Sequence, residues 1–232
     1  MDKNKLIKLL DFTRLSDNDT PEAVADFLNK AVTPFGAVAA VCVYPEFVAL
    51  AKKTLQGTGI KIATVANFPT GNEDLASVSA TIKQSLHDGA DEIDVVMPYQ
   101  HLIKGDHAYV IHYLTQCRAL TKNHVLKVII ESGELNREQI ITAATIVADI
   151  GADFVKTSTG KVAVGATLDA CDAILSVLST RQNSPGIKLS GGVNTPEQAN
   201  TYLACIANYM GDDWIDSSHL RFGASRLLDA LL

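Results

Sequence analysis

Short runs of apolar, often β-branched residues alternate along the sequence with longer segments in which apolar positions recur every three or four residues. The short runs are almost continuously apolar, which is typical of strands that are buried on both faces of a parallel sheet. The longer segments are amphipathic and predict helices with one buried face. The pattern predicts eight strands, at residues 9–12, 38–43, 60–66, 92–96, 126–130, 153–156, 186–188 and 214–216.

Helices are expected between these strands, and several begin at a recognisable cap. Thr20 precedes a proline at the start of one helix, and Asn72 and Asn136 are the predicted caps of two others. Thr195, with Gln198 three residues later, forms the sequence signature of a capping box. Further helices are expected at the N-terminus, at residues 46–55, 107–121 and 168–178, and at the leucine-rich end of the chain.

Regular repetition of a strand and a helix continues over residues 1–232 without a linker or a low-complexity segment. This organisation predicts one domain, a closed (β/α)8 TIM barrel with a short N-terminal helix. A doubly wound open sheet is the alternative, but it would not readily use eight near-equal units. Barrels of this kind work at the C-terminal ends of their strands. The polar residues expected there are Asp11, Cys42, Asn67, Asp94, Glu131, Lys156, Lys188 and Ser217.

Composition and charge exclude several classes of protein. The 232 residues are 47% hydrophobic and 20% charged, which is ordinary for a globular protein with a sizeable core. A net charge of −6 argues against binding to nucleic acid or to a membrane surface. The longest apolar run, residues 35–43, is too short to span a bilayer, and no signal-peptide core precedes the first strand.

Cysteine and histidine usage narrows the expectations further. The four cysteines form no C-x-x-C pair, so we expect reduced, buried thiols and a cytoplasmic location. The six histidines show no ligand spacing, so we expect no metal ion. Barrels of this size commonly self-associate, and a homodimer is the expected assembly.

Two lysines end consecutive strands. Lys156 follows Phe154 and Val155 at the end of the sixth strand, and Lys188 ends the seventh. Neighbouring strands lie ~4.8 Å apart, so the two ammonium groups would be close together in an apolar surrounding. Burial and like-charge repulsion both lower the pKa of a lysine, and a neutral amine is the nucleophile that forms Schiff bases with carbonyl compounds. The alternative is a pair of surface lysines at strand ends.

Asp94 interrupts the apolar run of the fourth strand. Inward residues of alternate strands share a layer in such barrels, so Asp94 is expected to face Lys156. A carboxylate there could move protons next to a carbonyl together with Lys188, or it could simply neutralise a buried lysine.

Glycine-bearing loops follow the sixth, seventh and eighth strands. Glycines let backbone amides approach an anion closely, and each following helix offers its positive end. Loops after the last strands of barrels often hold a phosphate group. The residues expected to bind substrate or phosphate are Thr157, Gly160, Lys161, Gly191, Gly192, Gly223 and Ser225.

Three segments carry a resemblance to a known family. Residues 92–99 (EIDVVMPY), 154–161 (FVKTSTGK) and 187–193 (IKLSGGV) resemble deoxyribose-phosphate aldolases. The likeness extends to residues 40–45, 66–69 and 221–225. It implies a class I aldolase, without a metal ion or cofactor, that interconverts 2-deoxyribose 5-phosphate with glyceraldehyde 3-phosphate and acetaldehyde. It also implies Lys156 as the Schiff-base residue, with Asp94 and Lys188 as the proton relay.

The sequence departs from the family pattern at three places. Asn194 stands where the family often has arginine, and Arg226 stands where a serine is common. We hypothesise that Arg226 supplies the positive charge that is missing at position 194. The sequence ends at Leu232, without the tyrosine-ended tail of some relatives, which leaves a catalytic role for such a tail in doubt.

Other polar residues receive weaker interpretations. Asp11 and Thr13 either organise hydrogen bonds beside the site or serve the structure alone. Cys42 either contacts the substrate beside the site or is a small buried hydrophobe, and the second interpretation is favoured. Glu131 and Glu134 are interpreted as caps of the loop that follows them.

Lys127 lies early in the fifth strand and is expected toward the opposite end of the barrel, in a structural role. Two other functions remain open. One is a phosphosugar isomerase or lyase that uses Lys156 with Glu131 as base. The other is a barrel that binds a phosphorylated metabolite as a sensor, without turnover.

Overall fold

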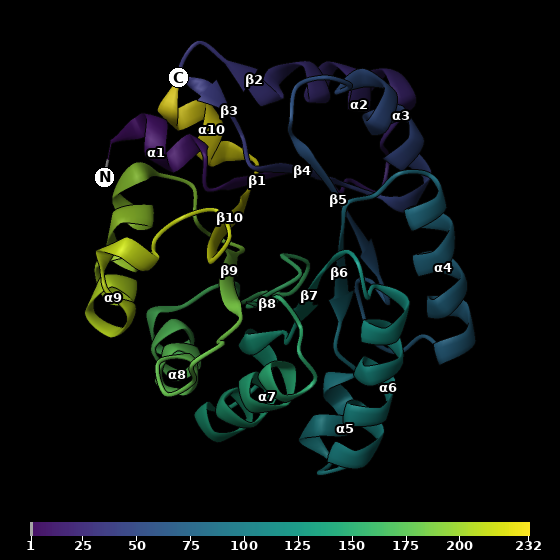
Figure 1. Cartoon of the computed structure of the whole chain (residues 1–232), viewed down its shortest axis with the longest axis vertical. Coiled ribbons are helices and arrows are strands. Elements are labelled where there is room, and N and C mark those ends of the chain that lie inside the picture. Colours follow the sequence, from purple (N-terminus) through teal and green to yellow (C-terminus); the bar gives the residue numbers. More distant parts are fainter. Residues whose placement is uncertain (1) are drawn as a thin grey trace.

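The computed structural model describes residues 2–232 and closes eight parallel strands into a barrel that is surrounded by helices (Figure 1). Each barrel strand pairs with the next one along the chain, and the first pairs with the last. The predicted (β/α)8 barrel is therefore confirmed. Its strands are β1 (Leu10–Thr13), β4 (Ala40–Val43), β5 (Lys61–Ala66), β6 (Glu92–Val96), β7 (Val125–Ile129), β8 (Phe154–Lys156), β9 (Gly186–Ser190) and β10 (Leu220–Ala224).

A short helix precedes the first strand, as predicted, and it lies beside the last helix and a small antiparallel hairpin (Figure 1). The hairpin, β2 (Val32–Thr33) and β3 (Gly36–Ala37), was not predicted. The helices are α1 (Lys3–Ile7), α2 (Pro21–Leu28), α3 (Val48–Thr54), α4 (Leu75–His87), α5 (Tyr99–Ile103), α6 (His107–Leu120), α7 (Arg137–Asp149), α8 (Leu168–Leu178), α9 (Pro196–Met210) and α10 (Arg226–Leu231).

Three of the four predicted caps are confirmed. The Thr20 side chain accepts a hydrogen bond at the start of α2, and Asn136 and Thr195 each form a full capping box. The prediction for Asn72 is wrong, because Asp74 caps α4 and accepts hydrogen bonds from the two amides that follow the first helical residue. Asn72 instead contacts the hydroxyl of Thr70 in the preceding turn.

The predicted eighth strand, at residues 214–216, is also wrong. Trp214 ends a short 3-10 helix (Asp212–Trp214), and the Asp216 carboxylate accepts a hydrogen bond from the Ser218 amide at 2.7 Å. These bonds hold the segment in a turn, and the strand that pairs with β9 begins six residues later than predicted, at Leu220. Ser217 consequently precedes the strand and lies away from the C-terminal end of the barrel.

Candidate active site

Charged side chains occupy the interior of the barrel. Successive residues of a strand point to opposite faces, and in six strands a charged residue has apolar neighbours that pack outward. These charged residues are buried, with at most 6% of any one exposed. They are Asp11, Asp94, Lys127, Lys156, Lys188 and Arg221, and Glu92 joins them from the start of β6.

Asp94 lies at the centre of this cluster and contacts three lysines. Its Oδ2 is 2.8 Å from Lys156 Nζ and 2.7 Å from Lys188 Nζ, and its Oδ1 is 2.9 Å from Lys127 Nζ. Lys156 and Lys188 are direct neighbours in the register of β8 and β9, as the sequence predicts. Asp94 also faces Lys156 across the barrel, as expected.

A second group of ion pairs lies deeper in the barrel. Asp11 is 2.5 Å from Lys188 Nζ and 2.6 Å from the guanidinium of Arg221. Glu92 is 3.1 Å from Arg221 and also contacts Lys127. Lys127 does lie deeper than Lys156, but it belongs to the same network, which the sequence analysis did not anticipate. Arg221 and Glu92 were not singled out, although Arg221, a charged residue between Leu220 and Phe222, offered a usable signal.

The network holds four basic groups and three carboxylates. If every group were ionised, one positive charge would be left over in a buried place, where uncompensated charge is costly. Loss of one proton from one lysine would remove that excess. The geometry therefore favours a neutral amine somewhere in the cluster.

Lys156 is the member that gives up its proton most readily. Burial lowers the pKa of Lys156, Asp94 opposes this change, and Lys188 adds to it. Burial acts in the same direction on Lys188, but Asp11 and Asp94 outweigh it and raise its pKa. For Asp94, burial is outweighed by the three lysines, which hold its pKa well below the ordinary value. Asp94 is thus ionised, Lys188 is protonated, and Lys156 is the accessible amine.

A pocket of about 230 Å³ opens from Lys156 to the glycine-bearing loops. Most of the residues that the sequence analysis assigned to the substrate line it, namely Gly160, Lys161, Gly191, Gly192, Gly223 and Ser225, and Thr13 lines it too. Thr157 does not, because its hydroxyl bonds the Ser190 backbone and links β8 to β9. Asn194 lines the pocket, whereas Arg226 is exposed and does not. Lys161 is therefore the cation at this end of the pocket, where it also pairs with Asp17 at 2.8 Å.

The loop after β8 is fixed against its neighbours. Glu131 has a left-handed backbone (φ 52°), and its carboxylate accepts hydrogen bonds from the amide and hydroxyl of Thr159, the latter at 2.6 Å. A side chain at Gly165 would collide with the backbone of Gly191. Glu131 thus anchors this loop, rather than capping its own, and the anchored loop holds Gly160 and Lys161 in the pocket.

Two other polar residues expected at the C-terminal ends of the strands have structural roles. Cys42 is fully buried against Ala63 and Val65, and burial raises the pKa of its thiol, which agrees with its interpretation as a small hydrophobe. The Asn67 side chain bonds the backbone of Val96 and Glu73 at 2.8 Å each.

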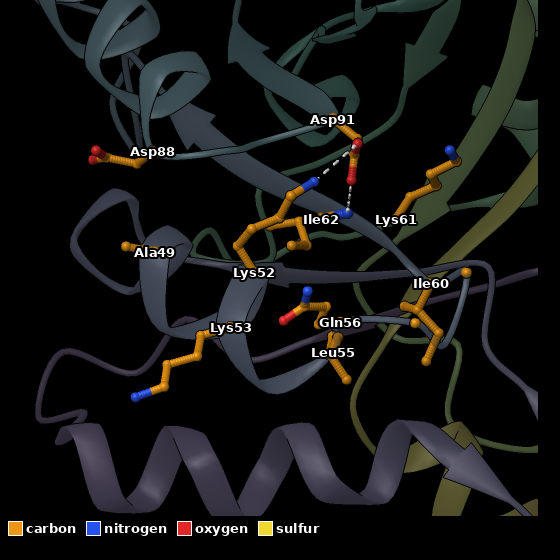
Figure 2. A pocket seen from close by; sticks show the side chains of 12 residues that line it. Ala49, Lys52, Lys53, Leu55, Gln56, Ile60, Lys61, Ile62, Asp88 and Asp91 are labelled. Carbon is orange, nitrogen blue, oxygen red and sulfur yellow. Dashed lines mark hydrogen bonds and ion pairs between the residues drawn. The ribbon is translucent and has the colours of Figure 1, made fainter.

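A second hollow, of about 610 Å³, lies at the opposite end of the barrel (Figure 2). Lys52, Lys53 and Lys61 line it with Asp88 and Asp91, and Asp91 is bonded to the Ile62 amide. Its lysines are exposed, its two aspartates are half-buried, and none of the residues that line it belongs to the buried network. We assign it no chemistry.

Comparison with known proteins identifies the family. The model of the DeoC/LacD family aldolases matches residues 5–212. The chain belongs to the DeoC/LacD aldolase family. An aldolase is a carbon–carbon lyase, so the chain is an enzyme of that type.

Solved structures of similar proteins agree with this membership. A protein of Toxoplasma gondii ME49, provisionally assigned as a deoxyribose-phosphate aldolase, shares 27% identity with a TM-score of 0.90, over 99% of this chain and 93% of that one. The aldolase QR15 shares 27% identity with a TM-score of 0.83, over 97% and 94% of the two chains. The deoxyribose phosphate aldolase of Aeropyrum pernix, described as a tetramer, shares 25% identity with a TM-score of 0.83, over 99% and 92%.

Residues 2–232 of this DeoC/LacD aldolase contain neither a membrane-spanning helix nor a cluster of metal ligands. No helix there is long and apolar enough to cross a membrane. No group of three or more His, Cys, Asp or Glu side chains there is arranged to hold a metal ion.

The buried network predicts the cost of removing a basic group. Lys127 is fully buried and pairs with three carboxylates, so Lys127→Met is expected to destabilise the protein by about 3–5 kcal/mol. Urea unfolding measures this change. The exposed Lys122→Met is the control and should alter stability by less than about 0.5 kcal/mol. A Lys127→Met protein as stable as its parent would contradict the assignment of Lys127 to the network.

Proposed function

We propose that this aldolase cleaves 2-deoxyribose 5-phosphate to glyceraldehyde 3-phosphate and acetaldehyde, reversibly, through a Schiff base on Lys156. The observation that carries the proposal is the position of Lys156. Its amine is the one in the charge network with a lowered pKa, and it opens directly into the pocket that ends at the glycine loops. A nucleophilic lysine and an anion cradle are what a class I aldolase of a phosphosugar requires.

The reaction begins with attack of the neutral Lys156 amine on the aldehyde carbon of the open-chain sugar. Loss of water from the carbinolamine gives a protonated imine, which acts as an electron sink. Removal of the proton from the C3 hydroxyl lets the C2–C3 bond break, so its electrons form an enamine and glyceraldehyde 3-phosphate leaves. The enamine carbon then takes up a proton, and water hydrolyses the imine to release acetaldehyde and Lys156.

Asp94 and Lys188 are the proposed proton relay for these steps. Lys156 and Lys188 contact the same oxygen of Asp94, at 2.8 and 2.7 Å, so a proton has a short path between the two amines and the carboxylate. Lys188 carries the proton for the relay, since Asp11 and Asp94 raise its pKa and keep it protonated, and Asp94 stabilises the positive imine through its negative charge. A water molecule bound beside this pair would carry the proton to the methyl carbon.

The phosphate group is assigned to the far end of the pocket. Gly191, Gly192 and Lys161 line that end, and glycines let backbone amides approach an anion closely. Lys161 pairs there with the exposed Asp17, and such exposed ion pairs are weak enough for a dianion to compete with them.

The other open functions have less support. An isomerase that uses Glu131 as base would need a free carboxylate, but that of Glu131 is engaged by Thr159. A sensor without turnover would have no need of an amine whose pKa is lowered by burial.

Trapping of the imine tests the proposed nucleophile. Acetaldehyde with borohydride should leave an ethyl adduct on Lys156, which mass spectrometry of the digested protein would locate. Lys156→Leu should abolish both the adduct and the release of glyceraldehyde 3-phosphate from 2-deoxyribose 5-phosphate in a coupled assay, while its circular dichroism stays unchanged. An adduct on another lysine, or cleavage by Lys156→Leu, would refute the mechanism.

The pH dependence of trapping tests the electrostatic argument. Only the neutral amine reacts, so adduct formation with acetaldehyde and cyanoborohydride should rise as pH rises through the pKa of Lys156. Lys188 lowers that pKa, so Lys188→Met should move the midpoint to higher pH. The exposed Lys53→Met, at the other end of the barrel, should not move it. A midpoint that stays in place or falls in Lys188→Met would count against the coupling of the two amines.

The proposed phosphate site predicts different effects of substitutions at Lys161 and at Arg226. Lys161 lines the pocket and Arg226 does not, so Lys161→Met should raise KM for 2-deoxyribose 5-phosphate about tenfold and leave that for unphosphorylated 2-deoxyribose unchanged. Arg226→Ala should change neither value. A rise in KM for the phosphorylated sugar alone in Arg226→Ala would restore Arg226 as the replacement for the charge missing at Asn194.

A further inference from the structure

One buried hydroxyl in the pocket has no hydrogen-bond partner. Ser190 is 5% exposed, it lines the pocket that contains Lys156, and its Oγ bonds no atom of residues 2–232. Buried polar atoms in folded proteins are normally paired, and an unpaired one costs stability. An unpaired hydroxyl at the wall of a binding pocket is therefore available to a ligand. The sequence analysis named the loop of Ser190 but assigned this side chain no role.

The backbone of Ser190 is held rigidly, although its side chain is free. Its amide donates to the Thr157 hydroxyl at 3.0 Å, and its carbonyl accepts from the Ala166 amide at 3.0 Å. In the adjacent strand it pairs with Gly223, and a Cβ atom built there would lie only 2.2 Å from Ser190 Oγ. The missing side chain at Gly223 therefore provides the space that this hydroxyl occupies.

Position along β9 shows which part of a substrate Ser190 would meet. Ser190 follows Lys188 by two residues, so its side chain is on the same inward face, ~6.6 Å nearer the mouth. The next residues, Gly191 and Gly192, form the far end of the pocket. The hydroxyl thus lies between the layer of the lysines and the glycine loops.

We propose that Ser190 binds a secondary hydroxyl of the sugar chain, between the carbon attached to Lys156 and the phosphate. This inference rests on the proposed function and adds a positioning residue for the acceptor half of the substrate. The serine hydroxyl both donates and accepts hydrogen bonds, which suits an alcohol. Its contact fixes the carbon chain when the C2–C3 bond breaks or forms.

Substitution of Ser190 should affect reactions of the whole sugar but not a reaction of acetaldehyde alone. Ser190→Ala should lower kcat/KM for cleavage of 2-deoxyribose 5-phosphate about five- to tenfold, because one hydrogen bond to the sugar is lost. The enzyme-catalysed exchange of the acetaldehyde methyl protons in D2O, followed by NMR, should stay unchanged, since acetaldehyde carries no such hydroxyl. The melting temperature should not fall, because no protein atom loses a partner. Unphosphorylated 2-deoxyribose should suffer the same loss as the phosphorylated sugar.

Ser85→Ala is the matched control, since Ser85 is another buried and unpaired hydroxyl, on α4 and outside the pocket. It should change none of these values. Full activity in Ser190→Ala, a parallel loss of methyl exchange, or a loss confined to the phosphorylated sugar would each overturn the proposal. Absence of both cleavage and methyl exchange in the unmodified protein would instead refute the proposed function itself.

Discussion

The contact of one buried carboxylate with three lysine amines is the interaction on which this site depends. Asp94 is fully buried and bonds Lys127, Lys156 and Lys188. Each charged group of this cluster loses its hydration, which costs several kcal/mol, and only mutual pairing offsets that loss. Because the paired groups come from different strands, their contacts also hold the barrel closed. The same contacts decide which proton is held least firmly.

The reactivity of Lys156 follows from its place at the edge of the charge network, next to the pocket. Lys127 and Lys188 are each enclosed by two or three carboxylates, whereas Lys156 contacts only Asp94 and borders the pocket. Burial therefore prevails for Lys156 and lowers its pKa, while attraction to carboxylates prevails for the other two and raises theirs. Like-charge repulsion from Lys188 contributes less than burial does. A pair of neighbouring lysines alone would not have produced this division.

Local patterns predicted the barrel, because strand and helix periodicity are properties of adjacent residues. The adjacency of Lys156 and Lys188 was also predictable, since consecutive strands are neighbours in such a barrel. Two local competitors caused errors: Asp74, rather than Asn72, directly precedes α4, and Asp216 forms a turn where a strand was expected. Arg221 was missed because its partners, Asp11 and Glu92, lie far away in sequence, and only the closed barrel brings them together. Lys127 was placed correctly, but its pairing with Asp94 on the neighbouring strand was not anticipated.

The arrangement reverses the usual division between an apolar interior and a polar surface. The apolar core lies between strands and helices, while charges fill the lower part of the barrel and leave its mouth to the substrate. Ion pairs between carboxylates and ammonium groups hold a lysine amine at a fixed position. Apolar packing around an amine would not fix its position in this way. The outer core can therefore supply stability while the inner network supplies position and charge. Lys127 does not line the pocket, yet it pairs with Asp94 and so affects the charge around Lys156.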